Sequence, residues 1–146
     1  MTSVGARTSF ICRGSVNLND ALRDGMSVDG AIGVAIVDCD TGSTVGKQGG
    51  NSLLDLDIAG AALAEVVQAK MRAIETLQLD DAIEDILVTL GSQYHIVMPL
   101  ESRPDSVSAV PDRRDKLFLY LVLDRAQANL ALARRHLRHI EQAVRI

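Results

Sequence analysis

Apolar residues group along the chain into short runs of strand length and into longer stretches that repeat at helical spacing. Five runs have the length and composition of strands, and they cover residues 29–40, 43–47, 83–93, 94–102 and 116–124. The first and the last are apolar on both faces, which is typical of strands covered on both sides of a sheet. Residues 91–93 carry the short hairpin signal that joins the third strand to the fourth.

Three stretches repeat apolar residues at helical spacing, and they cover residues 17–26, 53–79 and 126–146. The first has Asn17 or Asn19 available as its N-terminal cap. The second is the longest, and its alanines widen the apolar face beyond what packing on a single surface needs. The order of helices and strands predicts an α+β fold with three layers, in which helices cover both faces of a five-stranded, mostly antiparallel sheet.

The size of the chain, 146 residues and 15.7 kDa, predicts one domain. Residues 1–14 show no periodicity and are expected to form a variable extension, so the domain is assigned to residues 15–146. Residues 102–116 combine two prolines with polar residues and predict a loop. No apolar stretch is long enough to span a membrane, and the start of the chain lacks the apolar core of a signal peptide. Cys12 and Cys39 fit no Cys-x-x-Cys pattern and are expected to be cytoplasmic thiols.

The charges are distributed unevenly along the chain. Residues 1–112 carry 7 basic and 16 acidic side chains, a net charge of −9, whereas residues 113–146 carry 8 basic and 3 acidic side chains, a net charge of +5. The basic segment has aromatic residues only inside an apolar run, which argues against nucleic acid as a partner. It is expected to form an electrostatic patch, either for an acidic protein partner or for the acidic half of the same chain.

The stretch DTGSTVGKQGG at 40–50 superficially resembles a phosphate-binding loop. That loop needs G-x-x-x-x-G-K-[ST], but Gly42 and Gly46 are one residue too close together and Gln48 replaces the metal-binding hydroxyl. We interpret the stretch as a turn at 40–42 followed by a short strand, which the glycines at 46, 49 and 50 end.

The histidines are the remaining candidates for chemistry. His136 and His139 have the spacing of metal ligands on one helix, but a third ligand is missing nearby, so a solvated basic helix face is the preferred interpretation. His95 has no nucleophile with a supporting acid around it, and we expect it to be a histidine on the sheet surface with a hydrogen-bond partner.

The other titratable groups also give no active site. Cys39 lies beside two aspartates, which should raise the pKa of its thiol and make it unreactive. The pairs Asp80–Asp81 and Glu84–Asp85 are interpreted as solvated charges at the boundary between a helix and a strand. The sequence therefore predicts no catalytic residues, no metal site and no cofactor.

The remaining candidate for a functional site is the surface of the protein. The long helix carries more small apolar area than one sheet face needs, and the strand ILVTL can lie at a sheet edge, where it must be covered or paired. A second copy of the chain would cover both.

Four stretches carry a resemblance: VDGAIGVAIVDCDTG at 28–42, LDLDIAGAALAEVVQAK at 54–70, IEDILVTLGSQYHIVMPL at 83–100 and LFLYLVLDRAQANLALARRHL at 117–137. Together they resemble the roadblock / dynein light chain family in its bacterial, actinobacterial branch. The resemblance implies the roadblock (profilin-like) architecture. It also implies a non-enzymatic homodimer that serves as an adaptor or regulator, docking a small Ras-like GTPase or another signalling protein.

In such a dimer the edge strands of two copies join into one sheet and the long helices pack together. Carried over to this chain, the resemblance places the edge strand at 83–90 and assigns these residues to the dimer interface: Ala62, Val66, Ala69, Ala73, Ile86, Val88 and Leu90. The basic face of the last helix, with Arg134, Arg135 and Arg138, is a candidate docking surface for an acidic partner. Two alternatives remain open: a small-molecule sensor with a cavity between sheet and helix, and a hydrolase that uses His95.

Overall fold

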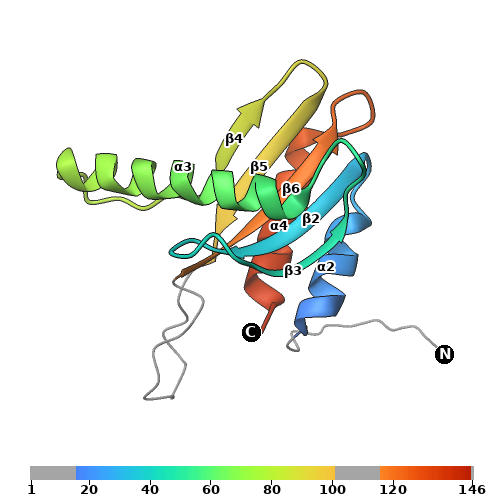
Figure 1. Ribbon diagram of the computed structural model, residues 1–146, viewed down its shortest axis with the longest axis horizontal. Coiled ribbons are helices and arrows are strands. Elements are labelled where there is room, and N and C mark those ends of the chain that lie inside the picture. The colour runs from blue at the N-terminus through green and yellow to red at the C-terminus, as the bar shows by residue number, and fades with distance from the viewer. Residues whose placement is uncertain (1–15, 101–115, 146) are drawn as a thin grey trace.

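The computed structural model describes residues 16–100 and 116–145 (Figure 1). The extension at 1–14, Cys12 and nearly all of the loop expected at 102–116 lie outside the described residues. The elements are, in chain order, α2 (Leu18–Met26), β2 (Ala31–Asp38), β3 (Thr44–Gly49), α3 (Leu56–Thr76), β4 (Ile86–Thr89), β5 (Gln93–Pro99), β6 (Leu117–Asp124) and α4 (Leu130–Ala143).

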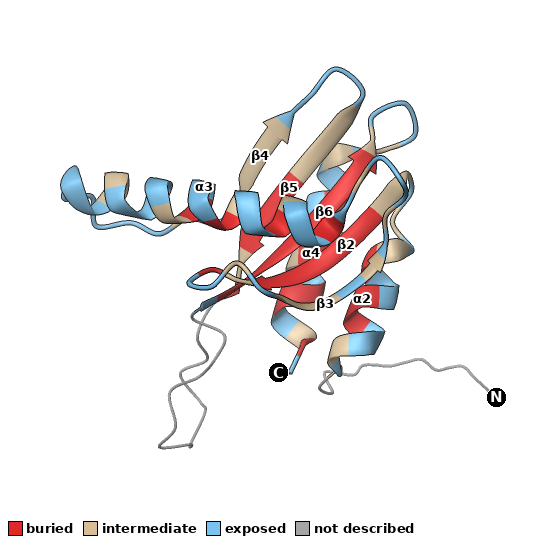
Figure 2. Ribbon diagram, viewed as in Figure 1, coloured by how far each residue is buried: buried red, intermediate tan, exposed pale blue. Residues whose placement is uncertain are grey.

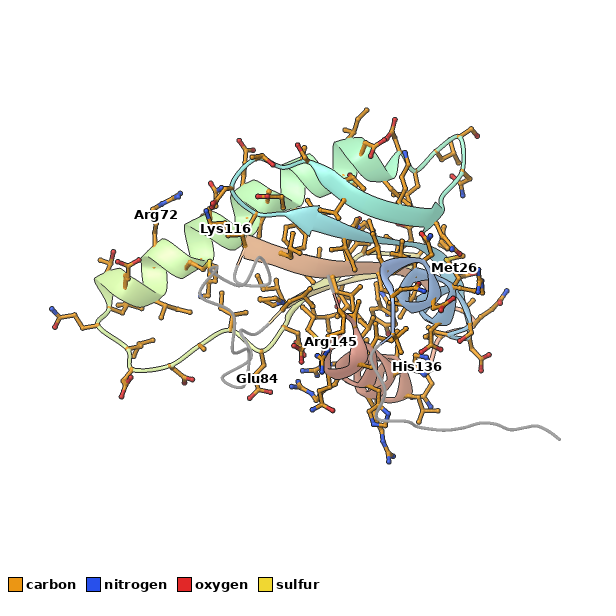
Figure 3. All side chains as sticks on the ribbon, turned by 90° about the horizontal axis from the view of Figure 1, so that it is seen from below. Met26, Arg72, Glu84, Lys116, His136 and Arg145 are labelled. Carbon is orange, nitrogen blue, oxygen red and sulfur yellow. The ribbon has the colours of Figure 1, made fainter. Side chains whose placement is uncertain are left out.

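The five strands form one antiparallel sheet in the order β3-β2-β6-β5-β4. β6 lies in the centre, and seven of its eight residues are buried (Figure 2). α2 and α4 cover one face of the sheet, where Leu22 and Leu137 pack against Leu119 and Leu121. α3 covers part of the other face; the three layers are seen edge-on in Figure 3. The α+β fold predicted from the hydrophobic pattern is confirmed.

Asparagine and aspartate caps set the helix starts more sharply than the apolar periodicity does. Asn17 accepts a hydrogen bond from the Asp20 amide and caps α2, as one of the two predicted alternatives requires. Asp55 caps α3, so this helix begins at Leu56 and not at residue 53. Asn129 caps α4, which therefore begins four residues later than expected.

The prediction that glycines end the second strand was wrong for Gly46 only. Gly46 lies within β3, opposite Ile36 of β2, whereas Gly49 is the last residue of the strand and lies opposite Gly33. Gly46 is needed for close approach, since a Cβ there would lie 2.9 Å from Leu22 Cδ1 of α2. A strand can carry glycine in its interior where another element packs this closely on its backbone.

Gly49→Ala is expected to lower the free energy of unfolding by about 2 kcal/mol or more. Gly49 has a φ of +78°, and a Cβ there would lie 2.6 Å from the Ile32 carbonyl oxygen, so backbone strain and a clash with backbone act together. Urea unfolding measures the loss, with Gly91→Ala as the control because a Cβ at Gly91 meets nothing within 4 Å. Equal stability of the two variants would contradict this account of the β3 end.

Candidate interaction surface

The long helix α3 uses only its first half to pack on the sheet. Its buried residues are Leu56, Gly60, Ala64 and Val67, at the spacing of one helix face. Beyond Val67 every residue of the helix is half-buried or exposed. The second half of α3 projects past the sheet on the side of β4 (Figures 1 and 2).

A stripe of small residues runs along the side of α3 that is turned away from this buried face. We call Ala62, Val66, Ala69 and Ala73 the alanine stripe; its members follow each other at steps of four, three and four residues. Such steps keep side chains on one face of a helix. Ala62, Val66 and Ala69 are exposed, with Val66 at 44%, and Ala73 is half-buried. Small side chains allow a second helix to approach closely.

Three larger apolar side chains are also exposed near the projecting end of α3. They are Met71 at 44%, Leu77 at 66% and Leu79 at 54%. The sequence did not single out Met71 and Leu79, because helical spacing alone does not show where a helix leaves its sheet. Met71 lies two residues from both Ala69 and Ala73, so it is on nearly the opposite side of the helix from the alanine stripe. The three exposed side chains together add apolar area to the projecting end of α3.

Strand β4 is the edge of the sheet on the same side of the molecule, and it pairs only with β5 among the described residues. Leu90 donates its amide hydrogen to the Gln93 carbonyl at 2.9 Å. Because hydrogen-bonded pairs alternate along an antiparallel ladder, the backbone groups of Leu87 and Thr89 are directed away from β5. β4 is shorter than the predicted strand at 83–90, and it presents a free edge.

The predicted interface residues of β4 flank this edge. Ile86 and Val88 are half-buried, and Ile86 packs with the residues beneath α3. Leu90 is 43% exposed in the turn between β4 and β5. The structure therefore places β4 on the side of the protein to which the second half of α3 projects.

Two of the three arginines predicted as a docking surface already bind acids of their own chain. Nε and Nη2 of Arg134 donate hydrogen bonds to the Asp85 carboxylate at 2.8–3.1 Å, and Arg138 Nη2 lies 3.2 Å from Glu84 Oε1. Arg135 is exposed. The basic segment thus meets the chain's own acidic half, the second of the two roles that its charge suggested. The interpretation of Asp85 as a solvated charge was wrong, since its side chain is only 7% exposed.

His95 has both ring nitrogens engaged on the sheet face below α3. Nδ1 lies 2.8 Å from the Tyr120 hydroxyl and Nε2 lies 2.9 Å from Gln93 Oε1. An amide oxygen only accepts, so Nε2 carries the proton and Nδ1 accepts from Tyr120. Burial lowers the pKa of His95 and raises the pKa of Tyr120 to about 12. The predicted hydrogen-bonded sheet histidine is confirmed, and a ring held in this way has no lone pair left to act as a general base.

The His136 side chain remains 39% exposed, and its Nε2 lies 3.0 Å from Asp24 Oδ1, a contact that the sequence did not predict and that joins α4 to α2 (labelled in Figure 3). The hydrogen bond to Asp24 raises the pKa of His136, and the same bond lowers the pKa of Asp24. No cluster of three potential metal ligands occurs among residues 16–100 and 116–145.

The free energy of unfolding is expected to fall between pH 6 and pH 8 by up to about 1 kcal/mol more in the wild type than in His136→Gln. A raised histidine pKa contributes stability that is present below the ordinary value and is lost as the pH rises through the folded value. The lowered Asp24 pKa keeps this contribution intact down to acid pH, where the carboxylate protonates. Urea unfolding at several pH values measures the effect, with the exposed His139→Gln as control. Identical pH profiles for the wild type and His136→Gln would refute this role.

The glycine-rich stretch at 40–50 is no phosphate cradle. Lys47 lies within β3 and its ammonium group binds the carboxylate of Asp57 on α3, which raises the pKa of the lysine. Cys39 is buried, and burial followed by the nearby Asp40 and Asp38 raises the pKa of its thiol, as predicted.

The described surface includes hollows beside two of its helices. One of about 430 Å³ is lined by residues 47 and 49–52 and by Leu54, Asp55 and Leu56, where β3 leads into α3. The other, of about 180 Å³, lies between the end of α2 and the start of α4 beside His136. Both open at the surface, whereas the sensor alternative predicts a cavity between the sheet and a helix. No helix in the described part of the chain is long and apolar enough to cross a membrane.

Known structures with a similar arrangement of these elements identify the fold. A Roadblock/LC7 domain from Streptomyces avermitilis superimposes with a TM-score of 0.67 at 14% identity, covering 87% of this chain and 93% of that one. The chain has the Roadblock/LC7 fold. MglB from Myxococcus xanthus shares this fold with a TM-score of 0.64 at 13% identity, covering 84% of this chain and 77% of that one. The gliding protein MglB from Thermus thermophilus gives a TM-score of 0.65 at 15% identity, covering 86% of this chain and 83% of that one.

The architecture implied by the four resembling stretches is therefore confirmed. At 13–15% identity the likeness is one of fold. An MglB of this fold has a tetrameric arrangement. The sequence itself matches no protein-family model and no curated protein.

Proposed function

We propose that this protein is a cytoplasmic homodimer that works as a non-enzymatic adaptor or regulator. The observation that carries the proposal is the free β4 edge on the side of the molecule to which the second half of α3, with Ala69 and Ala73 of the alanine stripe, projects. A two-fold axis beside β4 would pair the two copies of this strand and bring the two α3 helices together. Each copy would then satisfy the backbone groups of the other and cover its exposed apolar side chains.

The chemistry of the described residues supports a role in docking. His95 is held as a neutral hydrogen-bonding group, the Cys39 thiol is buried, and Lys47 is bound to Asp57. A fold alone does not determine function, which depends on the chemistry of particular residues. The side chains considered for catalysis are thus engaged in holding the protein together.

We further propose that the docked partner is a small Ras-like GTPase. The family that the sequence resembles serves such GTPases, and the Roadblock/LC7 fold of this chain agrees with that resemblance. Arg135 is the one member of the predicted basic docking surface that the chain leaves without an acid among the described residues.

Purified Ras-like GTPases from the same cell, loaded with GDP or with a non-hydrolysable GTP analogue, test this part of the proposal. We expect at least one of them to bind the dimer, and to bind it more tightly in one nucleotide state than in the other. Biolayer interferometry measures the affinities, and GTP hydrolysis with and without the dimer distinguishes activation from tethering. Absence of binding to all of these GTPases in both nucleotide states would refute a GTPase partner and leave the dimer itself to be judged by its mass.

A further inference from the structure

We propose that Arg134 and Arg125 are positioning residues that hold β4 from its two ends and thereby keep its free edge ready to pair with a second copy. This inference rests on the proposed homodimer. It gives Arg134 a different role from the partner docking that its place on a basic helix suggested.

At the first end of β4, Arg134 holds the residue that directly precedes the strand. Three hydrogen bonds join its guanidinium group to Asp85, with Nε–Oδ2 at 3.1 Å, Nη2–Oδ1 at 3.0 Å and Nη2–Oδ2 at 2.8 Å. A two-pronged contact of this kind fixes orientation as well as distance. The Asp85 side chain is 7% exposed, so solvent screens this pair less than a surface pair. Arg138 and Glu84 form a second, more exposed pair beside it.

At the other end, Arg125 holds the turn that follows the strand. Its Nη1 donates to the Leu90 carbonyl at 2.6 Å, and its own amide donates to the Ser92 carbonyl at 3.0 Å. Its guanidinium carbon also lies 5.1 Å from the centre of the Tyr94 ring. These contacts tie the β4–β5 turn to the segment that follows β6.

Both arginines belong to well-packed segments, whereas β4 has few stabilising contacts of its own. Ala133 and Leu137 of α4 are fully buried on either side of Arg134, and the Asp124 amide next to Arg125 donates to the Gly30 carbonyl at 2.8 Å. β4 has only four residues, none of them buried, and follows the mostly exposed segment 77–82. A short strand with one neighbour frays readily, and a frayed edge must be ordered before it can pair with another strand. Holding both ends in advance removes this cost from association.

Hydrogen exchange measured by NMR separates the order of the strand from its pairing. By the alternation of the ladder, the amides of Ile86 and Val88 point to β5 and report whether β4 is ordered. The amides of Leu87 and Thr89 point outward and are protected only when a second copy pairs with the strand. In the wild type we expect Ile86 and Val88 to be protected at any concentration, and Leu87 and Thr89 to gain protection as the dimer forms.

Arg134→Ala and the double variant Arg134→Ala/Asp85→Ala test whether the Arg134–Asp85 contact positions β4. Both are expected to speed exchange at Ile86 and Val88 at least tenfold and to weaken dimerisation at least tenfold, with exchange in β2 and β6 unchanged. Arg134→Lys, which keeps the charge but loses the two-pronged contact, is expected to fall between them and the wild type. Arg135→Ala is the matched control, because Arg135 is the exposed neighbour on the same helix. Arg125→Ala is expected to act in the same direction from the other end of the strand.

The possible results lead to different conclusions. If the wild type dimerises and Arg134→Ala dimerises as tightly, the positioning role is overturned while the dimer stands. If the double variant recovers the wild-type affinity, the defect comes from an unpaired Asp85 charge, and the positioning role is again overturned. If the wild type remains a monomer and its Leu87 and Thr89 amides never gain protection, the proposed dimer itself fails.

Discussion

Thr89→Pro is expected to convert the protein from a dimer to a folded monomer, raising the dissociation constant roughly hundredfold or more, about 2.8 kcal/mol in binding free energy. The Thr89 amide is directed away from β5, so proline removes no bond within the monomer. It removes an amide that a partner strand would use and places a ring in the path of that strand. Because the dimer has a two-fold axis, the substitution occurs twice in each interface.

The control is Thr89→Ala, which keeps the amide and is expected to dimerise within a few-fold of the wild type. Thr89 is exposed, so neither substitution disturbs the core. Sedimentation velocity over a range of concentrations measures the dissociation constant, and circular dichroism verifies the fold. A Thr89→Pro variant that dimerises like Thr89→Ala would place the interface away from the β4 edge.

Ala69→Arg is expected to weaken the dimer to a similar extent through the second element of the interface. Ala69 is exposed in the middle of the alanine stripe, where a close approach of two α3 helices leaves no space for a long side chain. The two-fold axis would also bring the two new positive charges together in a poorly solvated place, at a cost of several kcal/mol.

Glu75→Arg is the matched control because it places the same residue on the other flank of α3. Glu75 is exposed, and it follows Ala73 of the stripe by two residues, which puts it on nearly the opposite side of the helix. It is expected to leave dimerisation within a few-fold of the wild type in the same sedimentation assay. An equal loss in both variants would mean that α3 responds to charge in general and not through the alanine stripe.

The hydrophobic pattern predicts most of the fold because the apolar positions along the sequence are the ones that the fold buries. The run at 116–124 is apolar on both faces, and the strand it forms, β6, is central and covered by helices on both sides. The bounds were less accurate wherever a polar side chain decided them. Asp55 and Asn129 each set a helix start later than the apolar periodicity suggests, because their side chains bond to the amides of the first helical turn.

The candidate surface was predictable only where it depends on the residues of one element. The alanine stripe lies within α3 alone, and its residues were assigned from the sequence through the family resemblance. The roles of Arg134 and Asp85 could not be predicted, because the two residues are 49 positions apart and meet only in the folded protein, where Arg134 of α4 reaches the residue that precedes β4. A single sequence shows that both are charged. It does not show that each neutralises the other, so the arginine was assigned to an outside partner and the aspartate to solvent.

The mass of the wild-type protein in solution is the most direct test of the central claim. Multi-angle light scattering at micromolar concentrations is expected to give about twice the 15.7 kDa of the chain. A mass of 15.7 kDa across that range would contradict the account, because the free edge of β4 and the alanine stripe would then stay uncovered in the working protein.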